Sequence, residues 1–210
     1  STVRLNNGVR MPMFGLGCRR VETESETARA VLASIEAGYR FIDTASVYEN
    51  EAAIGRALRA SSVPRDDFFI ATKVWNSDQG YDRTLEAFDR SLSLMGLDYI
   101  DLYLLHWPMI RLRRESWRAL THLVKSERCR AIGVSNFTVR HMEEIIAESG
   151  VAPAVNEVEF NPYLNQTTLQ RWCSRHDIQL VTNRPVTKGN RLRDPRLLEI
   201  ASHYGKTPDQ

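Results

Sequence analysis

The sequence predicts an α/β fold in which parallel strands and helices alternate around a barrel. Short apolar runs typical of buried strands end at seven places, and amphipathic segments with helical spacing lie between them. Successive strand ends are 24 to 33 residues apart, which is the length of one βα unit. Because the pattern repeats without reversal, it favours a parallel barrel over a doubly wound sheet.

The elements follow in chain order. Asn7-Gly8, between apolar segments 3–5 and 9–11, predicts a β-hairpin at the N-terminus. The apolar runs predict strands that end near Cys18, Asp43, Lys73, His106, Ser135, Glu159 and Val186. The helical spacing predicts helices over 27–37, 51–60, 83–95, 115–126, 139–149, 167–176 and 195–204. A further helix is expected to begin at Thr207.

The number of units defines the expected fold class. A (β/α)8 TIM barrel has eight strands, whereas residues 1–210 supply about seven βα units. We therefore expect a single barrel domain over 1–210, preceded by the hairpin, that is C-terminally incomplete and lacks the eighth strand. No linker rich in proline, glycine or serine divides the chain.

Composition narrows the class of protein. The 42% apolar and 26% charged residues are ordinary for a globular domain, and a net charge of +2 is too small to indicate nucleic acid or an anionic membrane. The longest apolar runs have the length of strands, and the N-terminus has no apolar signal core. Cys18, Cys129 and Cys173 are odd in number and widely spaced, so we expect reduced thiols, no zinc site and a cytoplasmic protein.

The segment 38–51 contains the first candidate site residues. An apolar strand ends on the carboxylate of Asp43, and Tyr48 follows in the next loop. A carboxylate at the end of a buried strand needs a partner, because burying an unpaired charge is costly. Lys73 and His106 end two later strands, and carboxyl ends of barrel strands meet on one face. We therefore expect these four side chains to share a pocket.

Their chemistry indicates proton transfer to a carbonyl. Lys73 is the cation that Asp43 requires, and a lysine near a phenol is expected to lower the pKa of Tyr48 from about 10 toward neutrality. Tyr48 would then act as a general acid, with His106 hydrogen-bonded to the same substrate oxygen. The alternative is a structural Asp–Lys pair with an unrelated surface tyrosine.

The motifs carry a resemblance to a known family. Segments 38–51 and 92–108 and the run Gly133-Val134-Ser135-Asn136-Phe137 resemble those of aldo-keto reductases, of the bacterial type related to 2,5-diketo-D-gluconate reductases. The similarity extends over essentially the whole chain. It implies reduction of an aldehyde or ketone with NADPH, in which Tyr48 donates the proton while Asp43, Lys73 and His106 assist.

The resemblance also implies binding residues. Ser135 and Asn136 match residues that hold the nicotinamide carboxamide, and a hydroxyl and an amide can pair with that group. Trp75 and Trp107 would line the substrate pocket, the alternative being ordinary core packing.

Two positions depart from the family pattern. Glu157 replaces the usual glutamine, and an ionised carboxylate only accepts hydrogen bonds, so we expect perturbed cofactor binding. Segment 180–189 lacks the tyrosine that stacks on the nicotinamide, and Arg184 lies nearby as a possible stacking residue. A basic set could contact the cofactor phosphates or form a solvated loop: Arg184, Lys188, Arg191, Arg193 and Arg196.

These observations predict a monomeric, NADPH-dependent carbonyl reductase with a small-molecule substrate, no metal, and neither a nucleic-acid nor a membrane partner. The alternative is a cofactor-binding regulatory or structural protein on the same fold, with little turnover. The intact set around Tyr48 favours the enzyme, whereas Glu157, Arg184 and the missing eighth strand favour the alternative.

Overall fold

The computed structural model describes residues 1–19, 23–186, 189 and 191–210. Seven parallel strands pair in chain order: β3 (Gly15–Gly17), β4 (Phe41–Asp43), β5 (Phe69–Val74), β6 (Ile100–Leu105), β7 (Cys129–Ser135), β8 (Val155–Glu159) and β9 (Gln179–Asn183). A helix follows each of them: α1 (Glu24–Glu36), α2 (Glu51–Ala60), α3 (Tyr81–Met95), α4 (Arg113–Lys125), α5 (Val139–Ser149), α6 (Thr167–Arg175) and α7 (Pro195–His203). Short 3-10 helices lie in the connections: η1 (Ser46–Tyr48), η2 (Arg65–Asp67) and η3 (Asn76–Asp78).

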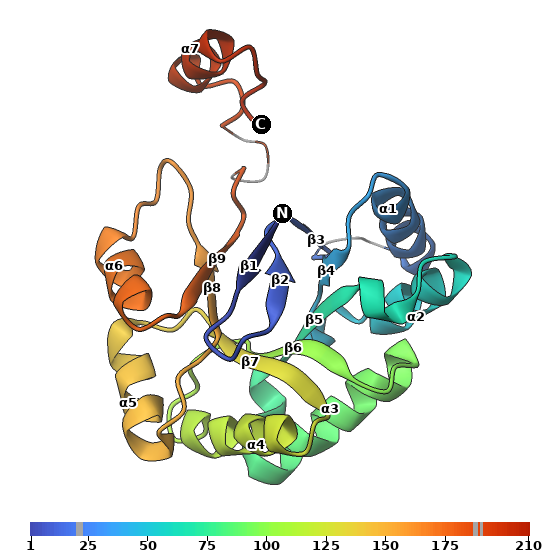
Figure 1. Cartoon of the computed structure of the whole chain (residues 1–210), viewed down its shortest axis with the longest axis vertical. Helices are drawn as coiled ribbons and strands as arrows, with labels where there is room; N and C mark the ends of the chain where they lie inside the picture. The colour runs from blue at the N-terminus through green and yellow to red at the C-terminus, as the bar shows by residue number, and fades with distance from the viewer. Residues whose placement is uncertain (20–22, 187–188, 190) are drawn as a thin grey trace.

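The sheet curves into a nearly closed barrel with helices on its outside (Figure 1). Each strand pairs in parallel with the next one in the chain, which confirms the predicted βα repeat. In the described part of the chain β3 and β9 are the edges, and no strand bridges them. Helix α7 lies apart from the ring of helices, beyond β9 (Figure 1).

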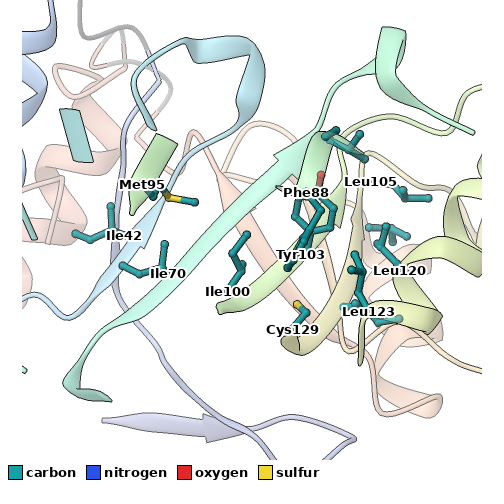
Figure 2. Packing of buried hydrophobic residues seen from close by; sticks show 14 of the residues in the cluster. Ile42, Ile70, Phe88, Met95, Ile100, Tyr103, Leu105, Leu120, Leu123 and Cys129 are labelled. Atoms are coloured by element: carbon teal, nitrogen blue, oxygen red, sulfur yellow. The ribbon is translucent and has the colours of Figure 1, made fainter. Parts of the chain in front are cut away.

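Side-chain alternation along the strands divides the core into two layers. The inner layer fills the barrel and contains Phe41, Phe69, Ala71, Leu102, Leu104, Ala131 and Val155. The outer layer lies between strands and helices, where Tyr103 packs edge-on against Phe88 of α3 with 4.9 Å between ring centroids (Figure 2). Because successive strand residues point to opposite faces, this alternation also decides which residues at the strand ends face the barrel mouth.

The predicted N-terminal hairpin is confirmed, as β1 (Thr2–Arg4) pairs antiparallel with β2 (Arg10–Pro12). Leu5 and Met11 are buried against the inner layer of the core. The Asn6 and Asn7 side-chain amides donate to the carbonyls of Pro153 and Arg130, which precede β8 and lie in β7. The hairpin therefore covers the barrel on the side opposite the carboxyl ends of the strands.

A close approach between β7 and β8 requires glycine at position 133. A Cβ atom there would lie 2.6 Å from the Val155 carbonyl oxygen and 2.7 Å from a methyl of Leu104. Two residues later, Ser135 pairs in register with Glu157. Gly133 thus fixes the spacing of the strands that carry two of the predicted site residues.

Some predicted boundaries were wrong. Helix α1 begins at Glu24 rather than residue 27, because the Thr23 hydroxyl caps it by accepting from the Glu26 N–H at 3.2 Å. Strand β9 ends at Asn183 rather than near Val186, because Arg184 adopts a left-handed φ of 58°.

The sequence predicts that a helix begins at Thr207. Residues 207–210 form a turn, in which the Gln210 N–H donates to the Thr207 carbonyl and the Gln210 side chain accepts from the Thr207 N–H. None of the helices that the structure describes is long and apolar enough to cross a membrane.

Candidate active site

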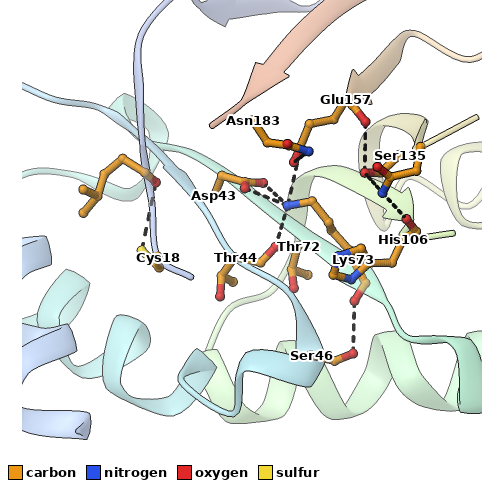
Figure 3. Close-up of polar contacts among 12 residues, drawn as sticks. Cys18, Asp43, Thr44, Ser46, Thr72, Lys73, His106, Ser135, Glu157 and Asn183 are labelled. Carbon is orange, nitrogen blue, oxygen red and sulfur yellow. Dashed lines mark hydrogen bonds and ion pairs between the residues drawn. The ribbon is translucent and has the colours of Figure 1, made fainter. Parts of the chain in front are cut away.

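The candidate site lies at the carboxyl ends of the strands, where the inner face of the barrel becomes polar. Asp43 and Lys73 lie two and four residues beyond the inner-layer Phe41 and Phe69, so the alternation points them to the same face. The same spacing brings in side chains from the next three strands: His106, Ser135 and Glu157. These residues lie on or directly after β4 to β8, and Figure 3 shows their side chains converging.

The Lys73 ammonium is fully buried at the centre of this group. It donates to both carboxylate oxygens of Asp43, at 2.6 and 2.7 Å, and to the Thr44 carbonyl at 2.9 Å. A carboxylate oxygen of Glu157 also lies 3.2 Å from it (Figure 3). The predicted pairing of Asp43 with Lys73 is confirmed, whereas the contact with Glu157 was not predicted.

Charge and burial oppose one another in this group. Burial disfavours the charged ammonium, but the carboxylates of Asp43 and Glu157 outweigh it and raise the pKa of Lys73. Burial and the neighbouring Glu157 carboxylate raise the pKa of Asp43 to about 7, even though Lys73 favours its ionised form. Lys73 therefore stays charged, and Asp43 holds its proton more tightly than an ordinary aspartate.

Tyr48 ends η1, directly after β4. The Ser46 hydroxyl anchors this turn by donating to the Lys73 carbonyl at 3.0 Å, and the Tyr48 ring lies edge-on to His106 with 5.7 Å between centroids. Burial raises the pKa of Tyr48, and the Lys73 ammonium opposes this effect without reversing it. The predicted lowering toward neutrality is therefore wrong, because Lys73 shares its charge with two carboxylates while the phenol loses water.

His106 is a neutral base in this environment. Burial, followed by the positive charges of Lys73 and Arg19, lowers the pKa of its imidazole to about 3. Its Nδ1 atom is buried without a hydrogen-bond partner among the described residues. A neutral imidazole carries one N–H and one acceptor nitrogen, so His106 can orient a polar group without a net charge.

The two predicted pocket tryptophans differ in position. Trp75 is half-buried, and its ring lies edge-on to His106 with 5.0 Å between centroids. Trp107 is 44% exposed, and its backbone carbonyl accepts from the Gln79 side-chain amide at 2.7 Å. Trp75 therefore forms a wall beside the imidazole, whereas Trp107 lies at the rim.

Ser135 and Asn136 lie where β7 ends. The Ser135 hydroxyl donates to the Glu157 carbonyl at 3.0 Å, and the Asn136 amide donates to Ser135 Oγ and to the His106 carbonyl, both at 3.0 Å. Asn136 has a left-handed φ of 61°, which asparagine tolerates better than most residues. Ser135 and Asn136, which the resemblance implies would bind the nicotinamide carboxamide, are thus held next to His106.

Glu157 completes this side of the site. Its side chain is 9% exposed, and one oxygen approaches Lys73 while the other accepts from the Asn183 amide at 3.4 Å. A hydroxyl, two amides and a carboxylate together supply donors and acceptors for a primary amide. This donor set suits the carboxamide of a nicotinamide.

Two members of the basic set contact other side chains in the described residues. The Arg184 guanidinium pairs with Glu159 at 2.8 Å, and Arg191 lies over the Tyr163 ring at 4.9 Å. Lys188 lies outside the described residues. Arg184 is thus held by a carboxylate on the neighbouring strand.

Sequence reasoning missed Asn183, the Thr44 carbonyl and the role of Asn50. The Asn50 side chain accepts from the Thr44 hydroxyl at 2.6 Å and donates to the Cys18 carbonyl at 2.7 Å, which fixes the loop after β4. Strand alternation could have placed Glu157 on the inner face with Val155. It could not have shown that this carboxylate reaches Lys73.

Comparison with known proteins adds a family assignment. The model of the aldo/keto reductase family matches residues 13–208. A glyoxal reductase of Bacillus subtilis is 47% identical over 209 residues, which cover 100% of this chain and 76% of the relative. A methylglyoxal reductase of Salmonella typhimurium is 41% identical over 212 residues, which cover 99% of this chain and 76% of the relative. The chain thus spans about three quarters of the length of these relatives.

Solved structures give the same result. An aldo/keto reductase from Brucella melitensis superposes with a TM-score of 0.94 at 44% identity, covering 99% of this chain and 80% of that one. A variant of Gox0644 in complex with NADPH superposes with a TM-score of 0.94 at 38% identity, and the match covers 99% of this chain and 76% of that one. The fold and the sequence therefore lead to one family.

Proposed function

The chain belongs to the aldo/keto reductase family, and from this premise we propose that Tyr48 protonates the aldehyde or ketone that it reduces. Family membership makes the protein an NADPH-dependent oxidoreductase. One observation supports this role of Tyr48 above the others. The buried Lys73 ammonium, which is hydrogen-bonded to Asp43, lies at the site where the rings of Tyr48 and His106 contact each other.

The proposed nicotinamide subsite consists of Ser135, Asn136 and Glu157. NADPH bound there would supply the hydride that reaches the carbonyl carbon. The Asn136 side chain and the Glu157 carboxylate can accept from the carboxamide NH2, and the Ser135 hydroxyl can donate to its oxygen after turning from the Glu157 carbonyl. Arg184 is a weaker candidate for a cofactor contact, because its guanidinium would first have to break the ion pair with Glu159.

The proposed proton path begins at the Tyr48 hydroxyl. The phenol donates its proton to the carbonyl oxygen as the alcohol forms, and the buried Lys73 ammonium stabilises the phenolate that remains. The neutral His106 imidazole donates a hydrogen bond to the same oxygen and orients the carbonyl. Asp43 keeps Lys73 charged and in place. Solvent then returns the proton to Tyr48.

The proposed substrate is a small carbonyl compound. The relatives named glyoxal reductase and methylglyoxal reductase support a short dicarbonyl such as methylglyoxal as the first substrate to test. Trp75 provides an apolar wall next to His106, and Trp107 provides the rim.

We further propose that the protein acts as a monomer in the cytoplasm. The buried, unpaired thiols of Cys18, Cys129 and Cys173 support a reducing compartment. Sedimentation at micromolar concentration tests the oligomeric state.

The test of the proposed acid is Tyr48→Phe, with Tyr39→Phe as the matched control because Tyr39 is 42% exposed and outside the site. Methylglyoxal reduction should fall by about 100-fold or more in Tyr48→Phe and stay unchanged in the control. NADPH affinity, measured by its fluorescence, should change less than about twofold. Full activity of Tyr48→Phe would overturn the assignment. Tight NADPH binding without turnover of any aldehyde by the wild-type protein would identify a regulatory or structural role instead.

A further inference from the structure

The ion pair between Lys73 and Glu157 crosses the mouth of the barrel. Lys73 is on β5 and Glu157 is on β8, and two strands separate them in the sheet. Both are nearly inaccessible, because the side chains of Lys73 and Glu157 are 0% and 9% exposed. Water therefore screens this contact far less than it screens a surface pair.

The group carries an unbalanced charge. Asp43 and Glu157 bring two carboxylates to the single ammonium of Lys73, and the neighbouring His106 is neutral. When both carboxylates are ionised, the group has one net negative charge. A glutamine at position 157 would leave the Asp43–Lys73 pair neutral.

Glu157 is also adjacent to the proposed nicotinamide subsite. Its carbonyl accepts from the Ser135 hydroxyl and from the Asn136 N–H, so its backbone and the carboxamide residues form one hydrogen-bonded unit. Its carboxylate accepts from Asn183 and approaches Lys73. The charge therefore lies beside the position that the proposed function assigns to the nicotinamide ring.

We propose that Glu157 determines which oxidation state of the cofactor this site prefers, because its buried carboxylate leaves a net negative charge beside Ser135 and Asn136. This inference rests on the proposed function, since it requires the nicotinamide to bind there. Oxidised nicotinamide is a cation and reduced nicotinamide is neutral. A nearby anion therefore stabilises bound NADP+ relative to bound NADPH.

Glu157 also raises the pKa of Tyr48. Its negative charge adds to the burial that raises the pKa of Tyr48, and it shares the ammonium that would otherwise lower that pKa. The carboxylate thus favours a protonated phenol together with an oxidised cofactor.

The ratio of the dissociation constants of NADP+ and NADPH isolates this effect. Both forms carry the same phosphates, so contacts to the phosphates cancel in the ratio, whereas the charge beside the ring does not. NADPH binding is followed by its fluorescence, and NADP+ binding by competition with NADPH.

Three variants separate charge from structure. Glu157→Gln removes the charge and should weaken NADP+ binding relative to NADPH binding, which raises the ratio of the NADP+ to the NADPH dissociation constant on the order of tenfold. Glu157→Asp keeps the charge and should stay within about threefold of the wild type. Glu115→Gln is the matched control, because Glu115 pairs with Arg118 on α4 and is 45% exposed. Its ratio should not change.

An unchanged ratio in Glu157→Gln, or a shift toward NADP+, would overturn the proposal. So would equal shifts in Glu157→Gln and Glu157→Asp, which would indicate a structural effect. If wild-type protein binds neither cofactor, the proposed function itself fails, and the two failures are therefore distinguishable.

A measurement on the wild-type protein covers the case in which Glu157→Gln does not fold. Lowering the pH from 8 to 5.5 should protonate Asp43, whose pKa is raised to about 7, remove the net negative charge of the group and move the ratio toward NADPH. The other groups facing it keep their charge in this window: Lys73 and Arg19 are cations, Tyr48 and Cys18 stay protonated, and His106 stays neutral. A ratio that is flat across this range would contradict the proposal.

Discussion

The ammonium of Lys73 lies 2.6 Å from the carboxylate of Asp43, in a position where the lysine is fully buried. Asp43 ends β4 and Lys73 is on the adjacent β5, so the pair connects neighbouring strands at the mouth of the barrel. Burying a lysine is favourable only when its charge is compensated. The electrostatics of Tyr48, His106 and Glu157 all depend on this pair.

Removing the cation should destabilise the fold. Lys73→Met leaves two buried carboxylates without a partner and should lower the free energy of unfolding by about 3–5 kcal/mol at pH 7.5. The loss should be smaller at pH 5, where Asp43 takes up a proton. Urea unfolding measures both values. Lys125→Met, at the exposed end of α4, should change stability by less than about 0.5 kcal/mol. A variant of Lys73 as stable as the wild type would show that the pair contributes nothing.

The ionisation of Asp43 should give stability a specific pH dependence. Its folded-state pKa, raised to about 7 by burial and Glu157, lies above the ordinary value of 3.8. The folded protein therefore binds an extra proton between these values, and stability falls as pH rises through this window. Relative to Asp43→Asn, the wild type should lose on the order of 1–3 kcal/mol between pH 4.5 and 7.5. Parallel urea-unfolding curves for the two proteins at every pH would contradict this result.

The pH profile of carbonyl reduction tests the direction in which the pKa of Tyr48 is shifted. The proton donor works only when protonated, and burial raises the pKa of Tyr48 above its ordinary value of 10.0. We therefore expect kcat to stay level from neutral pH to about pH 9.5 and to fall only in more alkaline solution. A descending limb centred near pH 7 would show that Lys73 dominates, as the sequence alone suggested.

The close contact at Gly133 predicts a steric effect on the site. Gly133→Ala should push β7 from β8, lower the free energy of unfolding by about 1–3 kcal/mol and weaken NADPH binding. Gly17→Ala on β3 is the control, because a Cβ there would meet nothing within 4 Å. Equal stabilities of the two variants would contradict the close-packing argument. Urea unfolding and NADPH fluorescence provide the measurements.

Much of the fold followed from local pattern. The spacing of apolar runs predicted the parallel repeat, and Asn7-Gly8 predicted the hairpin. The errors occurred where a single residue decides a boundary, as with the cap at Thr23 or the left-handed Arg184. Several residue types can occupy such positions, so periodicity does not reveal them.

The sequence by itself determined which side chains face the barrel mouth. A strand has a side-chain period of two, and this period points Asp43 and Lys73 to the same face once their strands are assigned. The pairing of the two followed from the cost of an unpaired buried charge.

Only the tertiary structure decided how the charges are shared. Glu157 reaches Lys73 because the sheet curves and brings β8 near β5, and no local pattern encodes a contact across two intervening strands. Burial of Tyr48 likewise depends on packing around the whole mouth of the barrel, and it reversed the expected pKa shift. Desolvation and the distance between charges are properties of the assembled barrel, and they set the electrostatics of this site.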